Sequence, residues 1–261
     1  TKEIAMSYND IRMKYYKTQQ NIPIGEARNF GLQYCTGQYL AFLDTDDMWT
    51  KDKLKLQIDL LDKEQKYAYC YTDYELIDSQ SKHTKDYITK HKNGYIFNNL
   101  LSWYEVCMPT IIIRKSILDN IEEKIDTSLS YCPDYDLFMR IASQYPVCSI
   151  KKILAKYRRV PDSLTSKTKL LHYKEIYKVS QKLLKLIPNI ESRYPKDYAH
   201  WQSWISKLEA DYYIRTNNLK EATRCLKKAE TLGRRHKLRY QMSLKENALE
   251  LLQTELMNVN F

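Results

Sequence analysis

The sequence has 261 residues, of which 43% are hydrophobic, and it carries a formal net charge of +10 at pH 7. This hydrophobic share excludes an intrinsically disordered chain, and no apolar run approaches the about 20 residues of a membrane span. The length predicts one large or two modest domains, and no charged-then-apolar signal segment opens the sequence.

The first elements predicted in chain order are two helices and a strand. Residues 3–18 predict a helix, and residues 25–35 predict a second one, which Gly37 can close in a left-handed conformation. Residues 39–43 form a continuous apolar run. A run of this length predicts a strand buried on both faces, as in a parallel sheet.

The elements that follow continue an alternation of helices and strands. Leu54, Ile58 and Leu61 recur with helical spacing and predict the buried face of an amphipathic helix. The remaining segments are a strand at 67–71, a polar irregular stretch at 75–95, a strand at 111–113, a helix at 137–143 and an extended segment at 147–155. This alternation is typical of an α/β fold.

Beyond about residue 166, helical periodicity replaces the strand signals as far as Leu256. We therefore predict a domain boundary between Pro161 and Thr168, which divides the chain into domains 1–165 and 166–261. The spacing of residues within 203–230 is similar to one tetratricopeptide helix pair. A generic helical hairpin has the same spacing, so both interpretations stay open.

The net charge is unevenly distributed. Residues 1–150 carry a net −3, whereas residues 151–261 carry +13. A basic helical domain 166–261 could bind an anionic membrane surface or a partner protein, or it could present a solvated surface. Nucleic acid is a less favoured partner, because no base-reading motif accompanies the charge.

The six cysteines are widely spaced and form no CxxC pair. This spacing disfavours a zinc site or a disulfide framework. Free thiols in a reducing compartment are the simpler interpretation, and they favour a cytoplasmic location.

Two carboxylates, Asp44 and Asp46, follow the apolar run at 39–43. Residues two positions apart on extended backbone lie on one side, and two such carboxylates can hold Mg²⁺ or Mn²⁺ together with phosphate oxygens. In open α/β sheets, ligands bind beyond the carboxyl ends of strands. The alternative is a turn in which Asp47 or Thr50 caps the next helix.

Two further segments carry candidate chemistry. Arg28 near the start of a helix could bind phosphate, or it could be an ordinary surface charge. Asp134 and Asp136 lie at the start of another helix, where an anion is stabilised. Such a carboxylate serves either as a helix cap or as a general base.

Taken together, these motifs resemble the inverting family-2 glycosyltransferases of GT-A fold, of the type that builds bacterial polysaccharides. Order and spacing fit over about residues 20–165. The segments that carry the resemblance are 25–31, 36–49, 53–57, 71–73, 113–116, 134–140 and 157–158. The resemblance implies a Rossmann-like mixed sheet flanked by helices, N-terminally incomplete, followed by the all-α region.

The resemblance also implies a reaction and a set of residues. A sugar would move from a nucleotide-diphosphate sugar to a glycan or lipid-linked acceptor, with inversion, for surface polysaccharide synthesis. Asp44 and Asp46 would bind Mg²⁺ or Mn²⁺, and Asp134 would be the general base. The other donor-binding residues would be Arg28, Thr45 and Asp47. The supporting residues would be Asn29, Trp49, Asp136, Arg140 and Arg158.

Three departures from the family pattern qualify these expectations. Pro133 stands where the family usually has Glu, and Val160 stands where a His is common. The nucleotide-binding strands that normally open the family would precede Thr1. We therefore expect this 261-residue piece to be inactive or poorly folded by itself. The alternative function is a non-catalytic fragment with a basic, protein- or membrane-binding tail at the inner face of the membrane.

Overall fold

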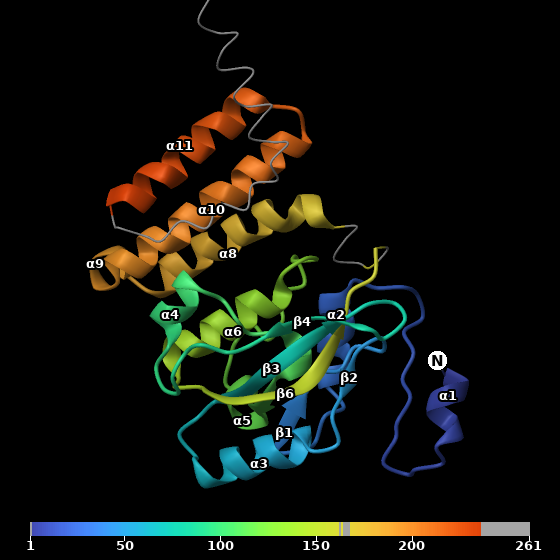
Figure 1. The fold of residues 1–261 in the computed structure, drawn as a ribbon. Helices are drawn as coiled ribbons and strands as arrows, with labels where there is room; N and C mark the ends of the chain where they lie inside the picture. Colours follow the sequence, from blue (N-terminus) through green and yellow to red (C-terminus); the bar gives the residue numbers. More distant parts are fainter. Residues whose placement is uncertain (1, 162, 164–167, 236–261) are drawn as a thin grey trace, which may run out of the picture.

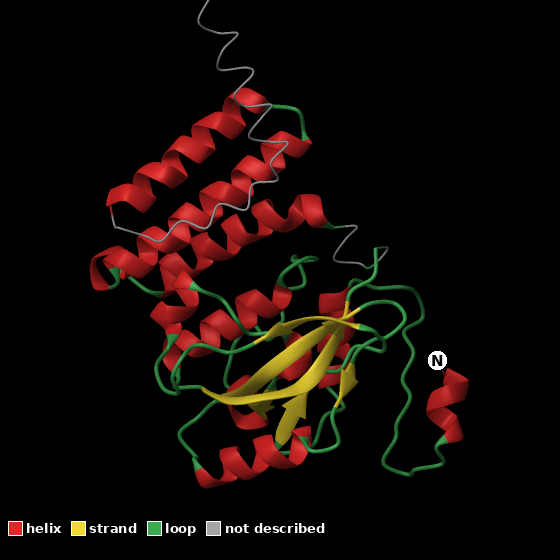
Figure 2. Ribbon diagram, in the orientation of Figure 1, coloured by secondary structure: helices red, strands yellow, loops and turns green. Residues whose placement is uncertain are grey.

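The computed structural model describes residues 2–161, 163 and 168–235 of the chain. They form a mixed sheet with helices on both faces and a stack of further helices on one side (Figures 1 and 2). The strands are β1 (Tyr39–Ala41), β2 (Met48–Trp49), β3 (Tyr69–Ile77), β4 (His83–Tyr87), β5 (Ile112–Arg114) and β6 (Cys148–Arg158).

The helices fall into two groups along the chain. Those of the α/β part are α1 (Lys2–Ser7), α2 (Ile24–Leu32), α3 (Lys53–Lys63), α4 (Phe97–Ser102), the 3₁₀ helix η1 (Met108–Thr110), α5 (Lys115–Asp119) and α6 (Pro133–Gln144). Those that follow are the 3₁₀ helix η2 (Lys169–Leu171), α8 (His172–Leu186), α9 (Ile190–Arg193), α10 (Pro195–Arg215) and α11 (Leu219–Arg235).

Strand β3 is the centre of the sheet, whose order is β1-β5-β3-β6-β2, with β4 also paired to β3. It runs parallel to β6, with Cys70 beside Cys148, and antiparallel to β4 and β5. Helices α4 and α6 cover one face, and α3 covers the other (Figure 1). This arrangement confirms the expected α/β class with a mixed sheet and flanking helices.

The strand that leads to the acidic loop differs from the prediction. β1 spans only Tyr39–Ala41, pairs antiparallel with β5, and buries only Leu40 of its three residues. Among the described strands it forms one end of the sheet, so one of its edges lacks a strand neighbour. Leu43 is 44% exposed. The apolar run therefore reflects neither a parallel strand nor burial on both faces.

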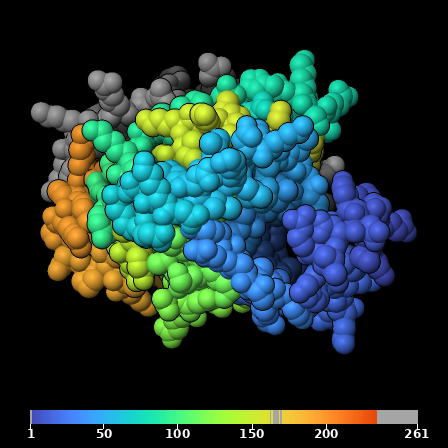
Figure 3. All heavy atoms as spheres, turned by 90° about the horizontal axis from the view of Figure 1, so that it is seen from below, coloured from blue at the N-terminus to red at the C-terminus, as the bar shows by residue number. Residues whose placement is uncertain are grey.

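The predicted helix at 3–18 is wrong beyond its first turns. α1 ends at Ser7, and Asn9 adopts a left-handed conformation with φ of 46°, which stops a right-handed helix. Asp10 and Arg12 then form a local ion pair at 2.6 Å. α1 buries no residue, and Figure 3 shows this N-terminal segment (dark blue) at one side of the molecule, separated by a hollow from the residues beside it.

Two other local predictions are corrected. α2 confirms the helix expected at 25–35, but Gly37 does not close it in a left-handed conformation, because the only glycine with positive φ among those described is Gly94. The stretch 75–95 is not wholly irregular, because β3 continues to Ile77 and β4 pairs with it.

Helix α3 is present where predicted, but a different face is buried. Lys53, Gln57 and Leu61 are fully buried, whereas Leu54 is 43% exposed. The Gln57 amide donates hydrogen bonds to the carbonyls of Cys70 (2.8 Å) and Thr110 (3.0 Å). These long-range bonds hold Gln57 inward, and the Lys53 amine donates to the Ile111 carbonyl (3.5 Å); the hydrophobic spacing alone predicted neither.

Lys53 gives this helix an expected pH dependence. Burial lowers the pKa of its amine from 10.5 to about 7. Between pH 7 and 10 the unfolded chain therefore holds a proton that the folded chain has lost, so stability rises with pH by at most about 1.4 kcal/mol per pH unit. We expect Lys53→Met to remove most of this rise, measured by urea unfolding at pH 7 and pH 9.

The neighbouring exposed Lys55 provides the matched control, since it pairs with Asp59 on the helix surface. Lys55→Met should leave the pH dependence of the unfolding free energy as in the unchanged chain. A Lys53→Met protein with the same slope as the parent would contradict the assignment.

The regular elements between residues 168 and 235 are all helices, as expected. α10 and α11 make a helical hairpin that turns at Asn217, where φ is 58°. The small residues Ala210, Ala222 and Ala229 are buried, and the Ser203 hydroxyl donates to the Ala229 carbonyl (3.1 Å).

The predicted domain boundary falls largely on residues 162 and 164–167, which lie outside the described part, as does the helical pattern expected from 236 to 256. α8 and α10 share one hydrophobic cluster with β3 and α6. None of the described helices is long and apolar enough to cross a membrane.

Candidate functional site

The acidic loop at residues 44–47 links β1 to β2. Its turn is closed by the Asp47 N–H, which donates to the Asp44 carbonyl (3.1 Å). Arg158, the last residue of β6, fixes the loop from outside. Its backbone N–H donates to the Asp47 carboxylate (2.8 Å), and its guanidinium donates to the Asp46 carbonyl (2.8 Å). Bonds from Arg158, which comes late in the α/β part of the sequence, thus hold Asp46 and Asp47 of the loop in place.

Arg28 on α2 reaches the same loop. Its guanidinium Nη2 donates to both carboxylate oxygens of Asp44 at 3.1 Å. The Arg28 side chain is 14% exposed and that of Asp44 is 44% exposed, so the pair lies at the protein surface with one side open to solvent. Arg28 and Asp44 are sixteen positions apart in the sequence, and both were predicted to be site residues. The structure brings them together.

The other members of the loop differ in burial. Thr45 and Asp46 are exposed, whereas Asp47 is buried and one of its carboxylate oxygens has no hydrogen-bond partner. Burial raises the pKa of Asp47 to about 7, and the charges of Asp46 and Asp44 add to that shift. Neither Asp47 nor Thr50 caps α3, whose N-cap is Asp52, so the capping alternative is wrong.

This donor set fits a hard divalent cation. It offers carboxylate oxygens, which Mg²⁺ and Mn²⁺ prefer, and one buried oxygen of the Asp47 carboxylate has no hydrogen-bond partner. The carboxylates of Asp44, Asp46 and Asp47 do not form one of the tight ligand groups found among the described residues. Asp44 is turned toward Arg28 instead.

Asp134 lies in the first turn of α6. It is distant from the acidic loop in sequence but near it in space. Burial raises the pKa of its carboxyl, and the negative charge of Asp44 raises it further. The positive charge of Arg28 and hydrogen bonds from the N–H groups of Tyr135 and Asp134 itself oppose that shift. Asp134 is thus within electrostatic reach of the Arg28–Asp44 pair.

The electrostatic surroundings of Cys107 also indicate that Asp134 and the acidic loop lie close together. Cys107 is half-buried, and desolvation of its thiol raises its pKa well above the usual value. The charges of Asp134, Asp47 and Asp44 raise it further. Three carboxylates, two from the acidic loop and one from α6, therefore act on the pKa of this one thiol. The sequence offered no signal for Cys107, which precedes η1.

The residues predicted to support the site make internal contacts. Asn29 exchanges two hydrogen bonds with the backbone of Ile125 (2.8 and 3.3 Å). The Trp49 indole donates to the Pro109 carbonyl (2.7 Å), and the Lys53 amine lies 4.3 Å from the centre of its ring. These contacts fasten α2 and β2 to neighbouring loops.

Asp136 and Arg140 form a buried ion pair at 2.7 Å on α6. Arg140 also donates to the carbonyls of Glu123 (2.7 Å) and Lys124 (3.0 Å). Pro133 stands at the first helical position of α6, where its missing N–H is not needed. The departure from the family pattern at this position therefore suits the start of the helix.

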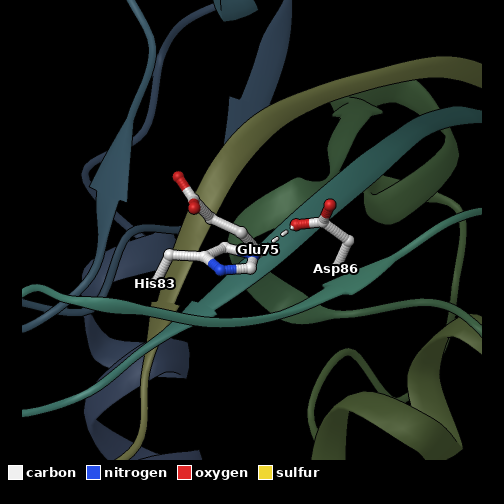
Figure 4. Close-up of side chains that lie close together, drawn as sticks. All are labelled: Glu75, His83 and Asp86. Carbon is white, nitrogen blue, oxygen red and sulfur yellow. Dashed lines mark hydrogen bonds and ion pairs between the residues drawn. The ribbon is translucent and has the colours of Figure 1, made fainter.

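A second group of side chains that could hold a metal lies elsewhere on the sheet. Glu75, His83 and Asp86 come from β3 and β4, and their ligand atoms lie within 4.8 Å of one another (Figure 4). Glu75 is already paired with Lys156 at 2.6 Å, and His83 with Asp86 at 2.8 Å. Each group is therefore satisfied by a partner within the sheet.

Comparison with known proteins adds an independent line of evidence. Residues 1–121 match the family model described as glycosyl transferase family 2. A glycosyltransferase of Rickettsia typhi is 32% identical over 67% of this chain and 55% of its own length. The Escherichia coli protein WfgD, a UDP-Glc:α-D-GlcNAc-diphosphoundecaprenol β-1,3-glucosyltransferase, is 27% identical over 62% of each chain.

Solved structures support the fold. The crystal structure of Staphylococcus aureus TarS 1-349 superposes with a TM-score of 0.62, covering 89% of this chain and 70% of that one at 15% identity. The mannosyltransferase PcManGT of Pyrobaculum calidifontis, in complex with GDP-Man and Mn²⁺, gives a TM-score of 0.54 over 100% of this chain and 66% of that one, at 14% identity. The GT-A fold expected from the sequence is confirmed.

The share of the relatives that this chain spans is limited. It covers 25% of a glycosyltransferase of Rickettsia conorii to which it is 28% identical over 59% of this chain. It thus spans between about a quarter and about three fifths of the length of the curated relatives named here.

Proposed function

We propose that the chain carries the catalytic part of an inverting glycosyltransferase, because residues 1–121 match the model of glycosyl transferase family 2. It would move a sugar from a nucleotide-diphosphate sugar to an acceptor hydroxyl. The observation that carries this proposal is that Arg28 of α2 pairs with Asp44 of the acidic loop, and that the charges of both act on the carboxyl of Asp134 in α6.

The acidic loop is the proposed donor side. Asp46 is exposed, and with Asp44 it would hold Mg²⁺ or Mn²⁺ against the donor diphosphate; the bound ion would offset the charge of the leaving group. Arg28 and the exposed Thr45 lie beside these carboxylates and would contact the phosphates. Asp47 would add negative charge behind the loop.

Asp134 is the proposed general base. A base must hold a proton only briefly, and a carboxyl whose pKa is raised accepts a proton more readily. Burial supplies that rise, while the two N–H groups at the start of α6 keep the carboxylate oriented. Removing the acceptor proton as the new bond forms on the opposite face of the sugar would give inversion in a single displacement.

The acceptor class rests on the relatives. WfgD is named for a diphosphoundecaprenol-linked acceptor, and TuaG of Bacillus subtilis, which is 27% identical over 64% of this chain, is named for teichuronic acid biosynthesis. We propose a saccharide or lipid-linked saccharide acceptor. Residues 1–165 and 166–261 are the proposed domains, the second a basic helical one that could contact an anionic membrane surface.

The proposal predicts metal-dependent turnover. The protein should release a nucleoside diphosphate from at least one UDP- or GDP-sugar in the presence of Mn²⁺ or Mg²⁺. Chelation with EDTA should abolish the release, because the leaving diphosphate then lacks its counter-charge. Liquid chromatography of the nucleotide products measures both arms.

Two outcomes would contradict the proposal. One is the absence of nucleotide binding and release across a panel of nucleotide sugars with either metal. The other is release that continues unchanged in EDTA, which would leave the acidic loop without the proposed metal.

A further inference from the structure

We propose that α8 and α10 position the catalytic base: Glu175 on α8 and Trp201 on α10 fix the start of α6 on both sides of Asp134. This inference rests on the proposed role of Asp134. It assigns part of the helical region to the framework of the active site, whereas the sequence alone suggested a separate binding module.

Glu175 holds the segment that enters α6. Glu175 is 8% exposed, and its carboxylate accepts hydrogen bonds from three consecutive backbone N–H groups, those of Ser130 (2.8 Å), Tyr131 (2.7 Å) and Cys132 (3.1 Å). Hydrogen bonds to an ionised carboxylate are among the stronger ones in proteins. Cys132 is the N-cap of α6, so these bonds fix the chain two residues before Asp134.

The residues just after Asp134 are held by the same two helices. The Trp201 indole donates to the Tyr135 hydroxyl at 2.9 Å, and both side chains are buried. The Lys182 amine of α8 donates to the Asp136 carboxylate at 3.1 Å. Asp134 lies between these anchors, and its own carboxyl is coupled to Arg28 instead.

The charge pattern fits positioning better than simple packing. Lys182 also pairs with Glu123 and with Asp126 (3.4 Å), and Lys178 donates to the Ser128 hydroxyl, so α8 places both an anion and cations on the loops around the start of α6. Apolar contacts alone would allow small rotations of α6, whereas paired charges and directed hydrogen bonds define its rotation. A misplacement of about 1 Å can cost a catalyst about a hundredfold in rate.

The test compares Glu175→Gln with a matched control in the full-length protein. The amide keeps the size of the side chain but loses one acceptor oxygen and the charge. We expect kcat for sugar transfer to fall about tenfold, while KM for the donor stays within about twofold because the acidic loop is untouched. Amide hydrogen exchange should quicken from Ser130 to Tyr135.

Val179→Ala on the same helix is the control, since Val179 is fully buried and packs by apolar contact alone. It should lower stability and leave kcat unchanged. Glu175→Asp, which keeps the carboxylate on a shorter stem, should fall between the parent and Glu175→Gln. If Glu175→Gln does not fold, Tyr135→Phe tests the Trp201 anchor by the same measurements.

Each outcome decides a separate point. Unchanged kcat and unchanged exchange at 130–135 in a folded Glu175→Gln protein would overturn the positioning role. A loss of kcat in Val179→Ala equal to that in Glu175→Gln would also overturn it, because general loosening would then suffice. Absence of turnover in the parent would refute the proposed function, and the exchange comparison would still decide whether Glu175 fixes the start of α6.

Discussion

Replacing Asp134 with Asn should lower the rate of sugar transfer by about a thousandfold. A positioned general base contributes between about 10² and 10⁴ in rate, and an amide of the same shape cannot accept the proton of the acceptor hydroxyl. Donor binding should persist, because Arg28 and the acidic loop are unchanged. Transfer kinetics and calorimetric titration with the nucleotide sugar measure the two effects separately.

Asp119→Asn is the matched control for this substitution. Asp119 is an exposed carboxylate on α5 that pairs with Lys115 (2.5 Å). Its replacement should leave transfer unaffected. Turnover by Asp134→Asn at the rate of the parent would remove Asp134 from the mechanism and leave the base unassigned.

Asp46→Asn should weaken metal-dependent donor binding by about a hundredfold or more. Even residues that only support metal ligands commonly cost 10- to 100-fold in affinity when replaced, and Asp46 is proposed as a direct ligand. Its exposed carboxylate makes no hydrogen bond or ion pair among those described, so its loss should disturb the fold little. Titration of the nucleotide sugar with and without Mn²⁺ gives the affinity.

Asp59→Asn controls for the loss of one negative charge, because Asp59 lies exposed on α3 and pairs with Lys55. That variant should bind the donor as the parent does. Equal donor affinity for Asp46→Asn and the parent, in the presence of Mn²⁺, would count against the acidic loop as the metal site.

The fold was predictable where the sequence pattern was local. The alternation of elements gave α2, α3, β5 and α6 near their observed places, because each is marked by a local pattern of apolar residues. The orientation of α3 was not predictable, because Gln57 is buried by hydrogen bonds to residues 13 and 53 positions away. The pairing of β1 with β5 likewise depends on partners distant in sequence.

The same distinction applies to the candidate site. Asp44, Asp46 and Asp134 were found because they follow or open regular elements, where functional carboxylates commonly lie. No sequence pattern distinguishes Glu175, since it is a single acidic residue in the first turn of an ordinary helix. Only its hydrogen bonds to residues 130–132 in the folded structure distinguish it from a glutamate on the surface of a helix.

Arg158 makes the order of folding relevant to the donor site. It is the last residue of β6, and β6 joins β3 across a long stretch of chain, with Cys70 beside Cys148. Such non-local pairings form slowly, because a long loop must close before any contact is gained. We therefore expect the acidic loop to reach its final form late in folding, because a nascent chain that ends before Arg158 lacks two of the bonds that shape it.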